Sequence, residues 1–184
     1  MARTLRQYGG VAKFLHWAVA VLLLAALIYA WNLPDSRKVY GYSDVLLWHK
    51  SFGISVLVLI VLRLIWRVAH PVAPALTLTP FEAVVSRVTH ALLYVTVLAM
   101  PLTGYLFSSL AGQHLELFGL IDLDTPFERD FALSRPIRAA HELGQWAIYV
   151  LVGLHAAAAL YHQFIKRDGM LARMLPMARS PEGG

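Results

Sequence analysis

The sequence predicts an all-α integral membrane protein, a four-helix bundle in a single membrane domain that covers residues 1–184. Of its 184 residues 58% are hydrophobic and only 15% are charged, which is too few charges to cover a soluble surface of this size. The apolar residues are also clustered, and stretches such as 14–33 and 143–165 contain no Asp, Glu, Lys or Arg. A helix of about 20 such residues crosses the hydrocarbon core of a bilayer.

Four segments are long enough to span a membrane, and we place them at approximately 13–33, 44–66, 84–109 and 139–165. The first segment contains no charged residue after Lys13. The second carries Lys50 and Arg63 near opposite ends, from which their long side chains can reach opposite interfaces. The third contains Pro101, which a membrane helix tolerates when its neighbours satisfy the freed backbone groups. The fourth follows the longest and most acidic connection, at 110–138.

The distribution of Lys and Arg predicts the orientation of the four spans. Ten of the sixteen basic residues fall on the side that holds both termini, which we therefore expect in the cytoplasm. The long connection at 110–138 is then expected outside. Because the basic residues are scattered at the ends of apolar segments, the formal charge of +5 favours contact with membrane lipid and predicts no nucleic-acid partner.

The chain contains no cysteine. This excludes disulfides, iron–sulfur clusters, thiolate-ligated haem and the covalent attachment of c-type haem. Any haem in this protein must therefore be held without a covalent link to the chain, and histidine is the expected ligand.

Histidine is uncommon inside membrane spans, and a histidine placed there indicates a functional site. Six of the eight histidines lie in the predicted helices, and so many in four helices predict a bound cofactor. They are His16, His49, His90, His141, His155 and His162. No role is predicted for His70 or His114, which lie in connections.

The spacing of His141 and His155 predicts two metal centres. The two residues are fourteen positions apart, so they share one helix face and lie about 21 Å apart along its axis. His49, at the outer start of the second span, is level with His141, and His16, near the inner end of the first, is level with His155. We therefore predict bis-histidine ligation by each pair, which leaves iron no open position and suits electron transfer.

The remaining histidines leave alternatives open. His90 lies in the same half of the membrane as His16 and competes with it as the inner ligand. For His90 and His162 we consider contact with a haem propionate or proton delivery to a quinone, against the alternative of interfacial side chains that are merely solvated. Gly53 and Gly144, close after two of the predicted ligands, remove side chains where a macrocycle needs room, although glycine is also common where membrane helices pack.

At these residues the sequence resembles the bacterial cytochrome b561 family, which includes the haem-binding membrane subunits of nickel–iron hydrogenases. The matching segments follow one another along nearly the whole chain, and their combination is specific. They are Phe14-Leu15-His16-Trp17, Trp48-His49-Lys50-Ser51-Phe52-Gly53, Arg63-Leu64-Ile65-Trp66-Arg67, His90-Ala91-Leu92-Leu93-Tyr94, Met100-Pro101-Leu102-Thr103-Gly104, His141-Glu142 and Gly153-Leu154-His155 through His162. The compact four-helix form, which ends in the tail Arg173-Met174-Leu175-Pro176, is most similar to the members described as superoxide oxidase.

The resemblance implies a bacterial inner-membrane protein with two haems b, which oxidises superoxide outside the membrane and passes the electrons to ubiquinone. A small anion is captured fastest where the local potential is positive, so Lys50 and Arg138 are expected to steer superoxide, and Arg37, Lys38 and Arg135 could add to this charge. Tyr94 joins His90 and His162 at the expected quinone end.

Two other functions remain open on the residues alone. The first is an electron conduit that anchors a separate dehydrogenase or hydrogenase subunit, with the same haems, a protein partner and no substrate of its own. The second is a bundle without haem, such as a transporter or an assembly factor.

Overall fold

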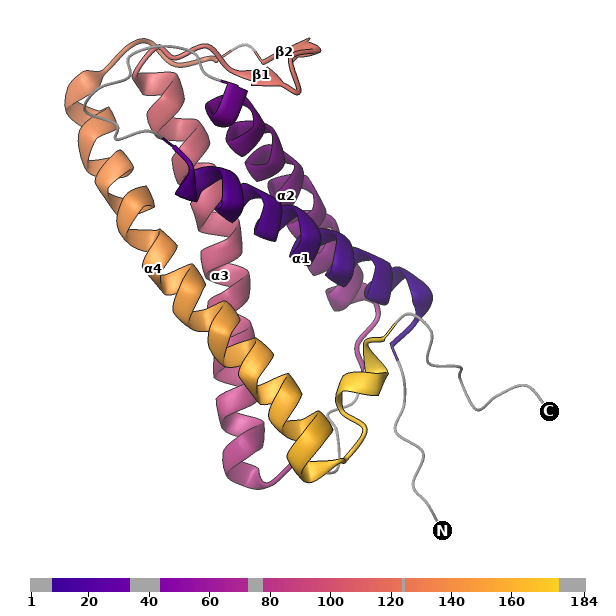
Figure 1. Cartoon of the computed structure of the whole chain (residues 1–184). Helices are drawn as coiled ribbons and strands as arrows, with labels where there is room; N and C mark the ends of the chain where they lie inside the picture. The colour runs from indigo at the N-terminus through magenta and orange to yellow at the C-terminus, as the bar shows by residue number, and fades with distance from the viewer. Residues whose placement is uncertain (1–7, 34–43, 73–77, 124, 176–184) are drawn as a thin grey trace.

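The computed structural model of the protein describes residues 8–33, 44–72, 78–123 and 125–175. It contains four long helices, each apolar and long enough to cross a membrane, as predicted. They are α1 (Gly10–Trp31), α2 (Asp44–Ala69), α3 (Pro80–Leu110) and α4 (Phe131–Tyr161) (Figure 1). Helix α4 continues into the π-helical turn η1 (His162–Lys166), which is followed by the short 3-10 helix η2 (Leu171–Arg173).

The third and fourth helices extend beyond the predicted spans, and a side-chain cap fixes the start of each. At α3 the Thr79 hydroxyl accepts a hydrogen bond from the Glu82 backbone N–H, and the Glu82 carboxylate accepts from the Thr79 backbone N–H. At α4 the carboxylate of Asp130 accepts from the Leu133 backbone N–H. Such caps satisfy the N–H groups that have no partner in the first helical turn, so α4 begins at Phe131, well before residue 139.

The connection between α3 and α4 contains a small antiparallel hairpin. Its strands are β1 (Glu116–Leu117) and β2 (Ile121–Asp122), and Glu116 lies opposite Asp122 in the register. The hairpin lies beside the start of α2, at the end of the bundle opposite to the described terminal residues (Figure 1).

The buried core joins all four helices at mid-length. It consists of Val19, Val56, Ile60, Val97 and Ile148. Ile148, only 1% exposed, lies midway between His141 and His155 on α4. A packed apolar layer therefore separates the two levels at which the histidines lie.

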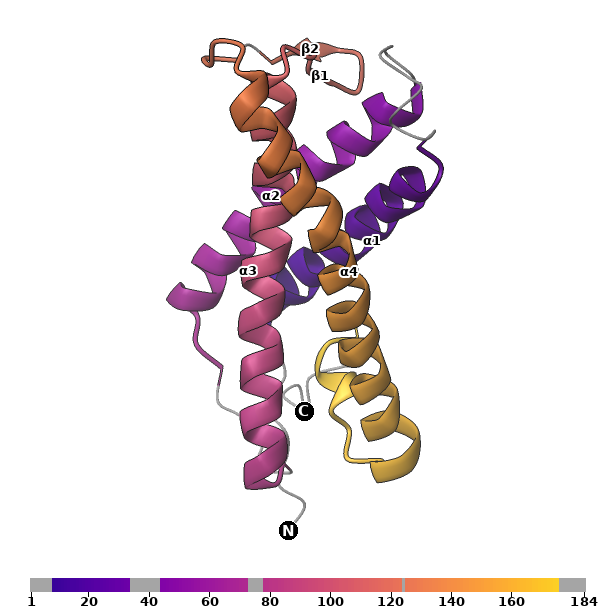
Figure 2. The ribbon, with the colours of Figure 1, turned by 90° about the vertical axis from the view of Figure 1, so that its left-hand side faces the viewer.

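The helices are arranged as two pairs. Helix α1 packs along α2 and α3 along α4, while α2 also contacts α3. Figure 2 shows that the α1–α2 pair is inclined to the α3–α4 pair. Large apolar side chains such as Val21, Leu24 and Ile28 are exposed on the outside of the bundle, as expected of a surface that faces lipid.

Both ends of the described chain meet at the same end of the bundle. The backbone N–H of Tyr8 donates to the carbonyl of Arg173 over 3.4 Å, and the indole Nε1–H of Trp17 donates to the carbonyl of Met174 over 2.8 Å. The first and last described residues therefore lie on the same side of the membrane. That this side is the cytoplasm stays a prediction from the Lys and Arg count.

Candidate functional site

The structure brings His49 of α2 and His141 of α4 together in the half of the bundle that carries the hairpin. Their ring centroids lie 6.3 Å apart and their planes are at 85°. The Nδ1–H of His49 donates to the carbonyl of Ala26 over 2.9 Å, and that of His141 donates to the carbonyl of Met100 over 2.9 Å. A carbonyl partner on Nδ1 fixes the tautomer and leaves the lone pair of Nε2 for a metal.

His16 of α1 and His155 of α4 meet at the other level, together with His90 of α3. The ring centroids of His16 and His155 are 6.1 Å apart, and those of His90 and His155 are 5.2 Å apart. The Nδ1–H of His90 donates to the carbonyl of Ser86 over 2.6 Å. The rings of both His16 and His90 therefore contact His155, and these contacts do not exclude His90 as the inner ligand.

The separations of the ring centroids test whether a metal fits between the histidines. Two metal–imidazole bonds of about 2 Å, each extended by about 1 Å to the ring centre, require about 6 Å between the centroids. The His49–His141 and His16–His155 separations agree with this value, and the His90–His155 separation is shorter, which favours His16 over His90. Each of these two pairs could therefore hold a haem iron between its imidazoles, and the assignment of the ligands stays a prediction.

The glycines near the histidines play different parts. A Cβ added at Gly53, four residues after His49, would meet no atom within 4 Å, which agrees with room for a macrocycle. At Gly144 the added atom would collide with the sulfur of Met100, so this glycine instead allows α3 and α4 to approach. At Gly104 it would meet the His141 ring, with Cε1 only 3.0 Å away.

Arg63 of α2 belongs to the inner group, and the sequence signal for this is its position fourteen residues after His49 on the same helix face. Its Nη1 donates to the carbonyl of Ala12 over 3.0 Å, and its guanidinium lies 5.9 Å from the centroid of the Tyr94 ring. Its charge acts on both His16 and His155. Within the described segments no carboxylate forms an ion pair with Arg63. Haem carries two propionates, and a guanidinium is the side chain best shaped to bind a carboxylate.

His162 is neither solvated nor in contact with the inner histidines in the described structure. Its side chain is buried at the start of η1, and its Nδ1 shares a 2.6 Å hydrogen bond with Oδ2 of Asp168. Its ring also lies edge-on to Tyr161. The expected contact of His162 with a quinone or a propionate stays a prediction.

The two basic residues expected to steer superoxide differ in their surroundings. Lys50 follows His49 directly, and its Nζ donates to Oε1 of Gln113 over 2.9 Å, a neutral partner. Arg138 donates through Nε to Oε1 of Glu142 over 2.8 Å, and this carboxylate neutralises much of its charge. Arg135 is exposed on the first turns of α4, while Arg37, Lys38 and the Pro176 of the tail lie outside the described residues.

Comparisons with known proteins agree with the observed architecture. A family model described as prokaryotic cytochrome b561 matches residues 7–177. The chain is 30% identical to "Cytochrome b561 homolog 2" of Escherichia coli K12, an alignment that covers 98% of this chain and 97% of the relative. It is 29% identical to "Probable superoxide oxidase CybB" of Yersinia pestis, over 95% of this chain and 98% of the relative. It is also 33% identical to "Cytochrome b561 homolog 1" of E. coli K12, over 89% and 93% of the two chains.

Proposed function

The chain belongs to the prokaryotic cytochrome b561 family, and from this premise we propose that it holds two haems b and transfers electrons from superoxide at the periplasmic face to ubiquinone. Membership makes the protein a multi-pass component of the bacterial inner membrane that works in electron transfer and carries haem b. The number of haems, the donor and the acceptor are the proposal.

The observation that carries the proposal is the pair of histidine sites. Each has two imidazoles at the separation that one metal requires, and α4 supplies one imidazole to each. When bound, haem supplies the one-electron redox change. The protein supplies the axial ligands, His49 with His141 and His16 with His155.

The residues around these ligands hold and orient them. The carbonyls of Ala26 and Met100 hold Nδ1–H of His49 and His141, which fixes the rings and makes Nε2 a better donor to a metal. At the inner site Arg63 is the expected partner of a propionate, because a guanidinium near the membrane interior needs an anion close to it.

Superoxide is the proposed donor because a relative of similar length is described as a probable superoxide oxidase, and because Lys50 places positive charge one residue from an expected ligand. Two superoxide anions each lose one electron and become O₂. One ubiquinone takes up these two electrons and two protons and becomes ubiquinol. Positive charge near the point of encounter raises the capture rate of an anion, and we expect Lys50 to contribute more than the paired Arg138.

We place the quinone at the inner level, beside His90 and Tyr94. These residues are four positions apart on α3 and so share one face of the helix. His90 is exposed on the bundle surface, where a membrane-dissolved quinone could receive a hydrogen bond or a proton from its ring.

The test begins with the purified full-length protein and its ratio of haem to protein. Potassium superoxide is then added without oxygen, with and without ubiquinone, while the haem absorption is followed. We expect two haems per chain, reduction by superoxide, and reoxidation by ubiquinone. His49→Ala should lose one haem, whereas His70→Ala, a matched change at an exposed histidine stacked on Trp66, should lose none. Two haems that do not react with superoxide would refute the donor and favour an electron conduit with a separate partner subunit.

A further inference from the structure

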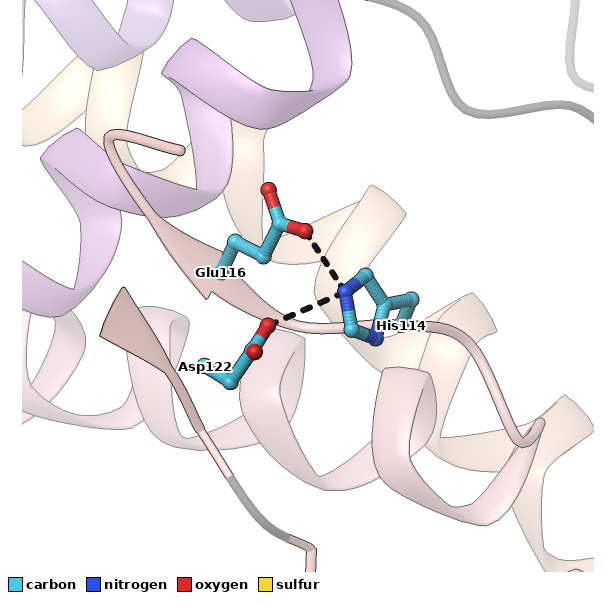
Figure 3. A group of neighbouring side chains, drawn as sticks. All are labelled: His114, Glu116 and Asp122. Atoms are coloured by element: carbon cyan, nitrogen blue, oxygen red, sulfur yellow. Dashed lines mark hydrogen bonds and ion pairs between the residues drawn. The ribbon is translucent and has the colours of Figure 1, made fainter. Parts of the chain in front are cut away.

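A cluster of three metal-ligating side chains lies on the hairpin, apart from the histidine pairs. The Nε2 atom of His114 is 2.6 Å from Oε1 of Glu116 and 3.2 Å from Oδ1 of Asp122 (Figure 3). All three ligand atoms lie within 4.8 Å of one another. The three side chains converge from β1, from β2 and from a position two residues before β1, and none belongs to the proposed electron-transfer site.

The register of the hairpin places two like charges opposite each other. Glu116 and Asp122 are paired across the two strands, and like charges in this position destabilise a hairpin. The strands are only two residues long, so their backbone hydrogen bonds provide little to offset the repulsion. A cation between the two carboxylates would turn this repulsion into attraction.

The hairpin that carries the cluster is fixed to the bundle. The fully buried hydroxyl of Ser51 in α2 accepts a 2.8 Å hydrogen bond from the Phe118 N–H and donates to the carbonyl of Glu116. Lys50 also donates to the carbonyl of His114, over 3.4 Å. The backbone on both sides of the ligands is therefore held in place, so a metal would not have to order a free loop.

From this arrangement we propose that His114, Glu116 and Asp122 bind a divalent transition-metal ion of the Zn²⁺ class. One imidazole nitrogen and two carboxylate oxygens suit such borderline ions, whereas Mg²⁺ and Ca²⁺ prefer oxygen ligands alone. Ligand atoms about 2.0 Å from a tetrahedral Zn²⁺ lie about 3.3 Å apart. The 3.2 Å separation of His114 and Asp122 agrees with this value, whereas the 2.6 Å separation of His114 and Glu116 is shorter and would have to widen when the ion binds. With side-chain exposures of 61% for His114 and 72% for Asp122, the ion can enter from solution and water can complete its coordination.

The test is a titration of the haem-loaded full chain, prepared without a polyhistidine tag, with Zn²⁺ against a chromophoric chelator. Loading with haem occupies the four proposed axial histidines, which could otherwise bind the probe. We expect one Zn²⁺ per chain, no comparable binding of Mg²⁺, and slower amide hydrogen exchange over residues 114–122 when Zn²⁺ is present. His114→Ala, Glu116→Gln and Asp122→Asn should each weaken binding by at least about tenfold.

Glu128→Gln is the matched control, because Glu128 is an exposed carboxylate of the same connection outside the cluster. It should leave the affinity for Zn²⁺ unchanged. An unchanged haem spectrum in each variant shows that the bundle has folded. The proposal is overturned if the chain binds no Zn²⁺, which leaves only the contacts of His114 with the two carboxylates. It is equally overturned if Zn²⁺ still binds with the same affinity after all three ligands have been replaced.

Discussion

Replacement of Gly104 by alanine should damage one haem site and spare the other. Gly104 lies on α3 against the ring of His141, and a Cβ at this position would be 3.0 Å from Cε1 and 3.3 Å from Nδ1. Ordinary contacts begin near 3.4 Å, so the ring must retreat by about 0.4 Å. It cannot do so freely, because Nδ1 is held by the carbonyl of Met100 and lies 3.2 Å from the hydroxyl of Thr103.

The expected loss of haem affinity follows from the free-energy cost of inserting a methyl group into a packed site. Such overpacking costs about 1–3 kcal/mol, and the displaced ring is the expected ligand of the outer haem. This energy corresponds to about a 5- to 150-fold loss of affinity for that haem. The inner haem, whose expected ligands His16 and His155 do not contact Gly104, should keep its affinity.

The assay is the ratio of haem to protein after purification and after incubation with apomyoglobin, which captures released haem. Gly104→Ala should release one haem faster than the unchanged protein and retain the other. Gly9→Ala is the control, since Gly9 precedes α1, has a φ of −63° and would place a Cβ with nothing within 4 Å. Equal retention of both haems in Gly104→Ala, or loss of both at the same rate, would refute the placement of a haem at His141.

Three further predictions concern single residues. His16→Ala should remove the inner haem and leave the outer haem with its absorption unchanged, a result read from the reduced-minus-oxidised spectrum; if His90→Ala has this effect instead, His90 is the inner ligand. Arg63→Gln should lower the midpoint potential of the inner haem by tens of millivolts, because loss of a nearby positive charge favours the oxidised iron. Arg63→Lys should restore most of the lost potential. A potentiometric titration in which only the outer haem shifts would contradict this prediction. Lys50→Gln should slow reduction by superoxide several-fold and flatten its dependence on ionic strength, as measured by stopped-flow absorption, whereas an unchanged rate and salt dependence would show that Lys50 does not steer the anion.

The features that follow from periodicity could be predicted from the sequence. Hydropathy and length identify four spans, because a bilayer of fixed thickness requires helices of a minimum length. The fourteen-residue spacing of His141 and His155 places them on one face of α4. Depth then pairs His141 with His49, but it leaves both His16 and His90 as partners for His155. These are properties of a regular helix in a layer, so they need no knowledge of the packing.

The features that depend on packing or on caps could not be predicted. The first turns of α4 contain Arg135, Pro136 and Arg138 and read as a polar connection, yet Asp130 caps a helix that already includes them. The hairpin has strands too short to show an alternating pattern, and its turn depends on successive positive φ angles at Phe118 and Gly119. The position of Arg63, by contrast, could have been predicted, because it lies fourteen residues after His49 on the same face of α2.

The apolar layer between the two histidine levels has a consequence for bioenergetics. Side chains such as Val56, Val97 and Ile148 fill the middle of the bundle and offer no group that could relay a proton. In the proposed reaction an electron that moves inward would thus cross this layer without a compensating proton, against the membrane potential that is negative inside. The two levels span about 21 Å of a core about 30 Å thick, so 100 mV opposes each transfer by at most about 1.6 kcal/mol. In a vesicle that maintains a membrane potential, turnover should therefore rise when an ionophore collapses that potential. The turnover rate of the proposed reaction would then depend on whether the membrane is energised.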